Sequence, residues 1–347
     1  MKKNQIVKWV VVFFFAGAFL SSCKQKKEEA SEDTVVATPA DTSAIGKKIA
    51  ELSNILLTDV KNADLYHQRA KLYIQKREME KAAMDIQKVM QLDTTKADYF
   101  VTLSDICLAG NKPRRAKYAL EKCLSLDPKN KEGNMKLAEL YFIARQYDQV
   151  FKYLNTILKV DIHNPKAYFM KGMTYKEMGD TIRAISSFQT AIEQEPKYYE
   201  PFMQLGIIYT LKNNKLALQY FNGAINIDPR SEEAIYGRAM WYQEHLHDFD
   251  KAIQDYTTIT QLNPKNIHAY FNLGYIHYQY LKVYDEAIKH YSEAINVDPE
   301  YSEAIYNRGL CYETVGNIGM AKLDFEKALR LHPDYTIAAQ ALGRVKQ

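Results

Sequence analysis

A motif of about 34 residues recurs along most of this 347-residue chain, and a repeated motif constrains the fold more than any single residue does. A polar or acidic residue followed by proline ends most copies. These dipeptides are Asp127-Pro128, Glu195-Pro196, Asp228-Pro229, Asn263-Pro264, Asp298-Pro299 and His332-Pro333. Proline lacks an amide hydrogen and restricts the residue before it, so each dipeptide predicts the end of a helix.

Two series of small residues keep the same phase as the prolines. The first series is Ala70, Ser104, Ala138, Gly172, Gly206, Ala239, Gly274 and Gly309. The second series is Ala82, Ala116, Val150, Ala184, Ala217, Ala252, Ala287 and Ala321. Small residues let two helices approach closely, so each copy predicts a packed helix pair. The spacing between the two series varies by one residue in places, and we expect the turn inside each pair to absorb it.

This arrangement resembles the tetratricopeptide repeat (TPR) pattern W-x2-L-G-x2-Y…A-x3-F…P. The eighth copy carries that pattern as Ile305, Arg308-Gly309, Tyr312, Ala321, Phe325 and Pro333. The third copy departs most, with Asn134, Val150 and no proline. The resemblance implies an all-α fold, an α-α superhelix (TPR solenoid) of eight helix pairs between residues 63 and 334. The expected pairs are 63–96, 97–130, 131–164, 165–198, 199–231, 232–266, 267–301 and 302–335, with capping helices at 44–62 and 335–347.

The first 22 residues have the pattern of a bacterial signal peptide. Lys2, Lys3 and Lys8 precede an apolar run from Trp9 to Leu20, which is too short to span a bilayer. The run ends in Leu20-Ser21-Ser22-Cys23, which resembles a lipobox. That resemblance implies lipidation of Cys23, typically including palmitate, and anchoring in a bacterial envelope.

Residues 23–43 are rich in Lys, Glu, Ser, Thr and Ala and predict a flexible tether. The run Lys24 to Glu29 resembles the surface-export signal of Bacteroidota lipoproteins, and a solvated charged tether is the alternative. Lys24 does not resemble the aspartate that retains some lipoproteins in the inner membrane. We therefore expect an outer-membrane lipoprotein that faces the periplasm or the cell surface.

The sequence offers little for catalysis. It contains no GxGxxG, P-loop, GxSxG or HExxH motif, so we expect no enzyme activity, no cofactor and no small-molecule substrate. The formal net charge of +4 includes three leader lysines, and the remainder is too balanced for a nucleic-acid binder. The segment Glu244 to Asp248 holds two histidines two residues apart, which do not share a helix face, so we expect a polar turn and no metal site.

Two cysteines and a short basic segment lie in the second pair. Cys107 and Cys123 fall where the helices of the second pair meet, and we expect core thiols, with a disulfide as the alternative. Lys112, Arg114, Arg115 and Lys117 form a small basic turn, which we interpret as solvated.

In TPR superhelices the first helix of each pair lines a concave groove that binds partner peptides. The expected lining of repeats 1–3 is mostly polar and that of repeats 4–8 is apolar. The predicted partner-binding residues are Phe169, Met173, Met203, Ile207, Tyr236, Met240, Phe271, Asn272, Tyr275, Tyr278, Tyr306, Asn307 and Leu310. Tyr anchors partners and Met adapts to irregular ones, while Asn272 and Asn307 can hydrogen-bond a peptide backbone. The alternative is that these side chains fill the interior or contact the neighbouring repeat.

The resulting hypothesis is a non-enzymatic, lipid-anchored scaffold that binds a protein or peptide. One alternative is a structural subunit of an envelope secretion, pilus or peptidoglycan machine that uses its convex face. A less favoured alternative is a glycan-binding module built on the groove tyrosines.

Overall fold

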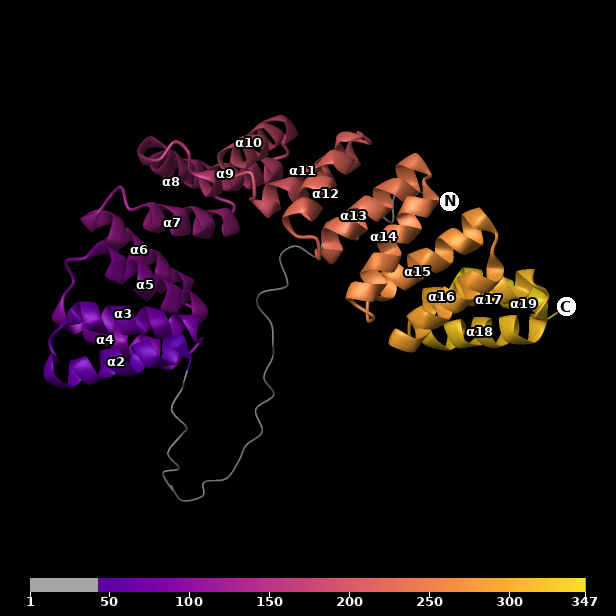
Figure 1. The fold of residues 1–347 in the computed structure, drawn as a ribbon, viewed down its shortest axis with the longest axis horizontal. Helices are drawn as coiled ribbons and strands as arrows, with labels where there is room; N and C mark the ends of the chain where they lie inside the picture. The colour runs from indigo at the N-terminus through magenta and orange to yellow at the C-terminus, as the bar shows by residue number, and fades with distance from the viewer. Residues whose placement is uncertain (1–42, 347) are drawn as a thin grey trace, which may run out of the picture. The chain divides into compact units, whose positions relative to one another are not determined.

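The structure is a computed structural model that describes residues 43–346, which form 18 α-helices and two π-helical turns (Figure 1). The predicted signal peptide, Cys23 and almost all of the tether lie outside these residues. The chain divides into two compact units, residues 1–178 and 179–347.

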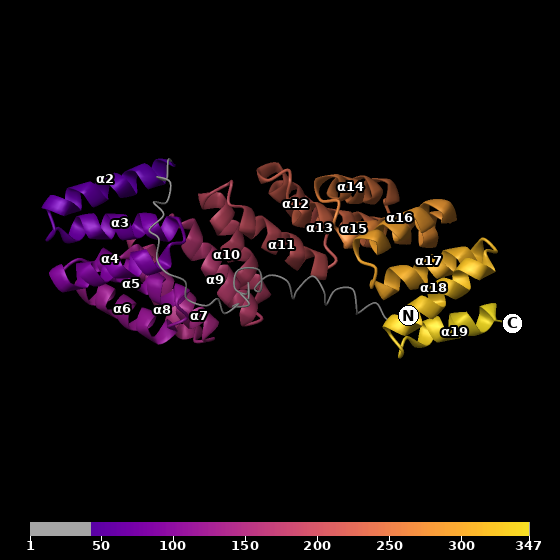
Figure 2. The ribbon, with the colours of Figure 1, turned by 90° about the horizontal axis from the view of Figure 1, so that it is seen from below.

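Unit 1 contains eight of the helices. They are α2 (Ala44–Thr58), α3 (Ala63–Gln75), α4 (Met79–Leu92), α5 (Ala97–Ala109), α6 (Pro113–Leu126), α7 (Lys131–Ile143), α8 (Tyr147–Val160) and α9 (Pro165–Glu177). Each helix packs against the next along the chain (Figures 1 and 2). Ala70 and Ala82 are fully buried where α3 meets α4, so the two series of small residues lie at the helix contacts, as their phase predicted.

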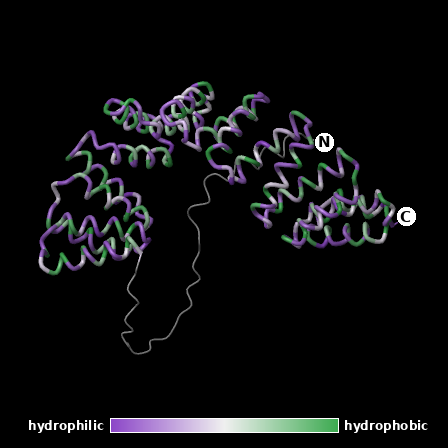
Figure 3. Tube along the Cα trace, in the orientation of Figure 1, coloured by the Kyte–Doolittle hydropathy of each residue, from purple (hydrophilic) through white to green (hydrophobic). Residues whose placement is uncertain are grey.

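Unit 2 contains the other ten α-helices and both π-turns. They are α10 (Thr181–Gln194), α11 (Tyr199–Leu211), α12 (Leu216–Ile227), α13 (Glu232–Trp241), η1 (Tyr242–Leu246), α14 (Phe249–Leu262), α15 (Ile267–Ile276), η2 (His277–Leu281), α16 (Tyr284–Val297), α17 (Ser302–Thr314), α18 (Ile318–Leu331) and α19 (Thr336–Val345). Hydropathy alternates along these helices because one face of each is buried (Figure 3).

Glycines of the first small series lie directly under aromatic rings. A Cβ at Gly274 would lie 2.8 Å from the ring of Tyr291, and one at Gly309 would lie 2.7 Å from the ring of Phe325. Neither contact leaves room for a methyl group, which explains the small residue. The all-α fold of paired helices, predicted as a TPR solenoid, is confirmed.

The extra residue in the sixth and seventh pairs lies inside the first helix. In both pairs the last turn of that helix widens into a π-turn, η1 or η2, and the following residue, His247 or Lys282, is left-handed with φ of 53° or 61°. This corrects the expectation that the connecting loop takes up the additional length. A widened turn keeps the backbone hydrogen-bonded, which a longer loop would not.

A left-handed residue occupies the turn between α-helices of every pair. These residues are Arg77, Asn111, Arg145, Gly179, Asn213, His247, Lys282 and Gly316. The turn is therefore the same in each pair, whichever side chain it carries.

Buried arginine–aspartate pairs join the two helices in three of the repeats. The pairs are Arg69–Asp85, Arg238–Asp255 and Arg308–Asp324. In each pair the guanidinium donates two hydrogen bonds to the carboxylate, and its remaining nitrogen donates to the preceding helix. The acceptors on that helix are Ser53, Asn222 and Ser292 respectively. Each arginine thus ties three consecutive helices together.

Candidate protein-binding surface

The first helices of unit 1 form a shallow apolar pocket that includes two of the predicted residues. Phe169 and Met173 of α9 line it together with Met170, and Phe142 and Ile143 of α7 lie opposite with one charged residue, Glu139. The pocket encloses about 280 Å³. Ile143 is 73% exposed, so an apolar side chain of a partner can bury it.

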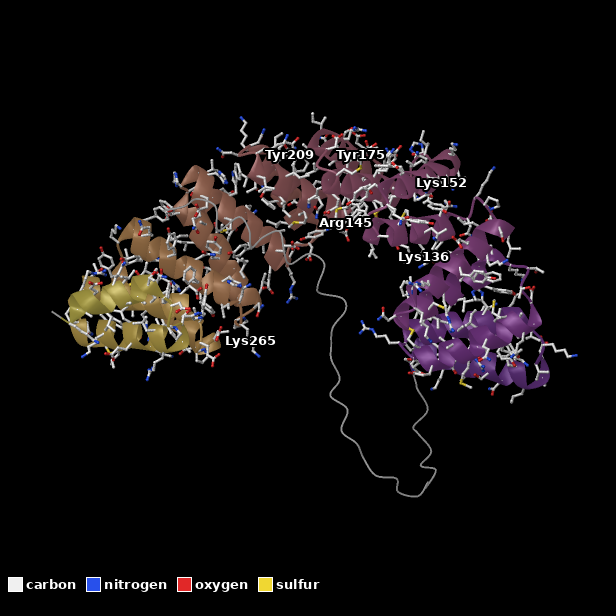
Figure 4. The ribbon with its side chains drawn as sticks, turned by 180° about the vertical axis from the view of Figure 1, so that it is seen from behind. Lys136, Arg145, Lys152, Tyr175, Tyr209 and Lys265 are labelled. Carbon is white, nitrogen blue, oxygen red and sulfur yellow. The ribbon has the colours of Figure 1, made fainter. Side chains whose placement is uncertain are left out.

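A second shallow pocket of about 200 Å³ lies between α3, α5 and α7, and six of its eight lining residues are polar or charged. Its charged lining residues are Lys71, Asp98, Asp105 and Glu132. Lys136, which is labelled in Figure 4, forms an ion pair with the carboxylate of Asp105 at 2.6 Å. This pocket therefore suits polar groups, as expected for the first repeats.

His67 belongs to the same face but lies beneath it. The ring is 8% exposed, and its Nε2 lies 2.8 Å from the hydroxyl of Thr102 on α5. Burial lowers the pKa of His67, so the neutral ring is favoured. This contact positions α3 against α5 and leaves little of the ring for a partner.

In unit 2 the predicted residues of α13 and α15 form a half-buried aromatic row. The amide of Asn272 donates to the hydroxyl of Tyr236 at 2.9 Å, and the ring of Phe271 lies 5.4 Å from that of Tyr301. Burial raises the pKa of Tyr236. The row is therefore held in place by contacts between neighbouring first helices.

The row continues along α15 and α17. Tyr275 meets Tyr280 edge to face with ring centroids 5.8 Å apart, and burial raises the pKa of Tyr280 to about 12. Tyr306 lies 5.2 Å from Tyr335, and Leu310 packs against the core of the last helices. The rings of Tyr236, Phe271, Tyr275, Tyr278 and Tyr306, here called the aromatic face, are all half-buried.

Two of the predicted residues do not present a surface. Met203 is 2% exposed and packs in a core cluster with Phe221 and Trp241, and Ile207 is 9% exposed. The expectation that these positions are exposed is wrong, because six consecutive residues of α11, 203–208, are buried. Spacing from the opening aromatic treats all pairs alike and misses this change.

Two further predicted residues, Met240 and Asn307, make contacts within the protein. Met240 is half-buried against the core beside Tyr236. The side-chain amide of Asn307 donates to the carbonyl of Glu303 at 2.7 Å within its own helix, so part of its hydrogen-bonding capacity is already used.

Comparison with known protein families identifies the repeated helix pair. The family model described as "Tetratricopeptide repeat" matches residues 63–96, 97–130, 165–198 and 302–335, and one described as "TPR repeat" matches residues 281–316.

The chain is a tetratricopeptide-repeat protein.

Known proteins resemble this TPR chain over limited lengths. A UDP-N-acetylglucosamine–peptide N-acetylglucosaminyltransferase of Giardia intestinalis is 36% identical over 90 residues, which are 26% of this chain and 6% of that protein. Anaphase-promoting complex subunit 3 of Schizosaccharomyces pombe is 24% identical over 185 residues, 53% of this chain and 28% of that protein. The TPR chain thus spans less than a third of these relatives.

A solved structure supports the fold. The structure titled "Functional Characterization of Pseudomonas Aeruginosa pilF" aligns with a TM-score of 0.52 at 17% identity, covering 58% of this chain and 92% of that one. At this identity the likeness shows the TPR fold alone. TPR proteins bind protein partners.

The described part of the TPR chain was predicted to hold a polar turn at residues 244–248 and no metal site. Between residues 43 and 346 no three His, Cys, Asp or Glu side chains are grouped so that they could hold a metal ion. His245 stacks on Trp241 at 4.0 Å, and its Nδ1 lies 2.7 Å from Oδ1 of Asn213. The two histidines of the segment 244–248 thus serve the π-turn, since His247 contacts the carbonyl of Gln243.

The cysteines of the described helices are free thiols. Cys107 is half-buried and Cys123 is fully buried, and they form no disulfide with each other. Burial raises the pKa of Cys123 to about 11, which keeps the thiol protonated and unreactive. No helix within 43–346 has both the length and the apolar character needed to cross a bilayer.

Sequence reasoning missed three residues of the apolar pocket: Phe142, Ile143 and Met170. A signal was available at Ile143. The equivalent residues of the pairs on either side in unit 1 are Ala109 and Glu177, and a large apolar residue among them at an exposed helix end marks a binding position.

Proposed function

We propose that this TPR protein is a lipid-anchored scaffold of the bacterial outer membrane that binds a segment of a partner protein on its first helices. The observation that carries the proposal is the open apolar pocket around Phe169 and Met173, which offers uncovered hydrophobic surface on the face used for binding in this family. The aromatic face of unit 2 also supports the proposal, because its rings are half-buried and are held in place by neighbouring side chains. Rigid aromatic side chains bind at low entropic cost.

Cross-linked co-purification from envelope fractions tests the binding surface. Tyr275→Glu places a charge on the aromatic face, and Ile143→Glu places one at the pocket of unit 1. We expect each change to deplete the same partner while circular dichroism and melting stay near wild type. Tyr118→Glu is the matched control, because Tyr118 is 61% exposed on a second helix.

The control separates the scaffold from the structural-subunit alternative. Three apolar side chains stand exposed at equivalent places on second helices: Met84 at 71%, Tyr118 at 61% and Leu323 at 58%. If Tyr118→Glu loses the partner while Tyr275→Glu and Ile143→Glu retain it, the partner binds that outer surface, as the structural-subunit alternative requires. Binding of defined sugars without protein would favour the glycan-binding reading.

The lipid anchor has its own test. The leader and Leu20-Ser21-Ser22-Cys23 support modification at Cys23, and Lys24 to Glu29 support export to the outer membrane. We expect metabolic palmitate labelling of the wild-type chain and none of Cys23→Ser. Labelling that persists in Cys23→Ser, or fractionation of the labelled chain with the inner membrane, would contradict this part of the proposal.

A further inference from the structure

The two units differ strongly in charge. Residues 43–178 hold 24 Lys and Arg against 16 Asp and Glu, a formal net charge of +8. Residues 179–346 hold 16 Lys and Arg against 21 Asp and Glu, a formal net charge of −5. The small net charge of the whole chain therefore conceals a basic unit, and such an asymmetry predicts an anionic partner for that unit.

Part of the basic charge of unit 1 is concentrated on one edge. Exposed cations occupy or adjoin the turns between α3 and α4, α5 and α6, and α7 and α8. This basic edge consists of Arg77, Lys112, Arg114, Arg115 and Arg145, of which Figure 4 labels Arg145. None of the five forms an ion pair within the described residues.

Contacts between first helices place these three turns in one row. The His67–Thr102 hydrogen bond joins residues 35 apart on α3 and α5, and Asp105 pairs with Lys136 across α5 and α7. These contacts set the three helices side by side with the same register, so the turns that follow them are neighbours. The acids near these turns do not neutralise the five cations. Glu78 is already paired with Lys76 at 2.6 Å and with Lys81 at 2.8 Å, so only Glu80 and Asp148 remain to offset them.

Two of these arginines have a left-handed backbone conformation, which is energetically unfavourable for arginine. Arg77 and Arg145 adopt φ of 60° and 55°, as His247 and Lys282 do at the same turn in unit 2, while the other equivalent residues are glycine or asparagine. A side chain other than Gly or Asn in this conformation is strained, and strain of this kind concentrates at functional positions. Folding alone does not favour arginine at these two turns.

The start of α6 is also charged against the helix dipole. Its first turn contains Arg114 and Arg115 and no acid, and its N-cap residue Lys112 makes no side-chain capping bond. Cations are disfavoured at a helix N-terminus. The whole row therefore accumulates positive charge against local preferences.

We propose that the basic edge of unit 1 binds the anionic headgroups of a phospholipid bilayer. The charges come from three separate turns in a row, which suits an extended surface better than a single phosphate group. The inference rests on the proposed function for the position of the membrane. If residues 23–43 form the flexible tether that their composition predicts, the start of α2 would lie at a root-mean-square distance of roughly 25 Å from Cys23 in the bilayer. An acidic second unit and a nearly balanced chain argue against nucleic acid as the partner.

Vesicle sedimentation tests this inference with the chain from residue 24 onward, which retains every described helix and its buried core. The probes are vesicles of phosphatidylcholine with and without phosphatidylglycerol. We expect binding only to vesicles that contain phosphatidylglycerol, and loss of that binding at high salt. The variant Arg77→Asn/Arg114→Gln/Arg145→Asn should bind about a hundredfold more weakly, at about fivefold per side chain. Asparagine already occupies this turn at Asn111 and Asn213, so the variant keeps its fold.

The matched control is Lys61→Gln/Lys129→Gln/Lys159→Gln, which removes the same charge from exposed positions at or near the opposite turns of unit 1. It should lose far less affinity than the edge variant. Equal loss in both variants, no binding to the anionic vesicles, or preferential binding of a competing DNA duplex would overturn the inference. Palmitate labelling of Cys23 is a separate test. If the full chain is labelled but the chain from residue 24 does not bind vesicles, only the membrane-binding inference is contradicted. If vesicles are bound but Cys23 is not labelled, only the proposed lipid anchor is contradicted.

Discussion

At the scale of single residues, the buried arginine–aspartate pairs occur only as complete sets. Where the first-helix position holds Leu103 in the second pair, the facing position holds Ala119 and no acid. A buried charge without its partner is far more costly than an apolar pair of similar volume. Arginine therefore occurs at this position only together with its aspartate, while the fourth pair holds Lys171 opposite Ser187.

Asp324→Ala should lower the free energy of unfolding by about 3 kcal/mol or more, because it leaves the guanidinium of Arg308 without its acceptor. The side chains of Arg308 and Asp324 are only 17% and 5% exposed, so water replaces little of the lost contact. Urea unfolding measures the loss. The double variant Arg308→Leu/Asp324→Ala, which copies the combination of the second pair, should recover most of it. A double variant no more stable than the single one would contradict this account.

Glu233 gives a pH-dependent prediction. Its side chain reaches solvent, but the surrounding protein disfavours the charged form and raises the pKa of the carboxyl to about 7 from an ordinary value of 4.5. The folded state thus binds a proton more tightly than the unfolded state. The charged carboxylate destabilises the fold increasingly as the pH rises from 4.5 to 7.

Glu233→Gln should therefore stabilise the protein at pH 8 and change its stability little at pH 4. Melting temperatures of the variant and the wild type at both pH values measure the difference. Glu303→Gln is the control, at the equivalent position of α17. An equal effect at both pH values would rule out titration as the cause.

At the scale of elements, the turn inside each helix pair is a fixed left-handed connection that tolerates different side chains at different cost. Gly179 and Gly316 adopt it with φ of 80° and 82°, and Arg77 adopts it with φ of 60°. Only glycine enters this region without a steric penalty.

Arg77→Gly should raise the free energy of unfolding by about 1 kcal/mol, and Gly316→Ala should lower it by a similar amount. Denaturant midpoints of the two variants provide the measurement. Glu80→Gly, inside α4, controls for glycine itself and should destabilise. Stabilisation by Glu80→Gly, or none by Arg77→Gly, would show that the turn is not strained.

The sequence predicted the helix pairs well because their determinants are local or periodic. Small residues and prolines recur in phase, and packing demands them at those places. The π-turns η1 and η2 were not predicted, since an added residue looks the same in sequence whether a loop or a helix absorbs it. Met203 and Ile207 were misplaced because their burial depends on how α11 packs with its neighbours, which no spacing encodes.

At the scale of the whole molecule, stability is distributed along the chain. Each helix packs chiefly against its neighbours in sequence, and in repeat proteins of this kind stability is a sum over repeats and their interfaces. Damage at one end should therefore stay local.

Phe325→Ala removes a fully buried ring that packs against Gly309, which should cost about 3 kcal/mol or more. We expect amide hydrogen exchange to accelerate in α17 to α19 and to remain unchanged in α3 to α6. Exchange followed by mass spectrometry measures both regions. Uniform acceleration over all helices would instead show that the chain unfolds as one cooperative block.

The third contact of each buried arginine has a consequence for how such chains grow by gene duplication. Because Arg308 also donates to Ser292 on the preceding helix, a copied segment that starts at α17 would separate that arginine from one of its acceptors. A segment that starts one helix earlier would carry the whole set to its new position. Successful recombination breakpoints in this chain should therefore fall before the second helix of a pair.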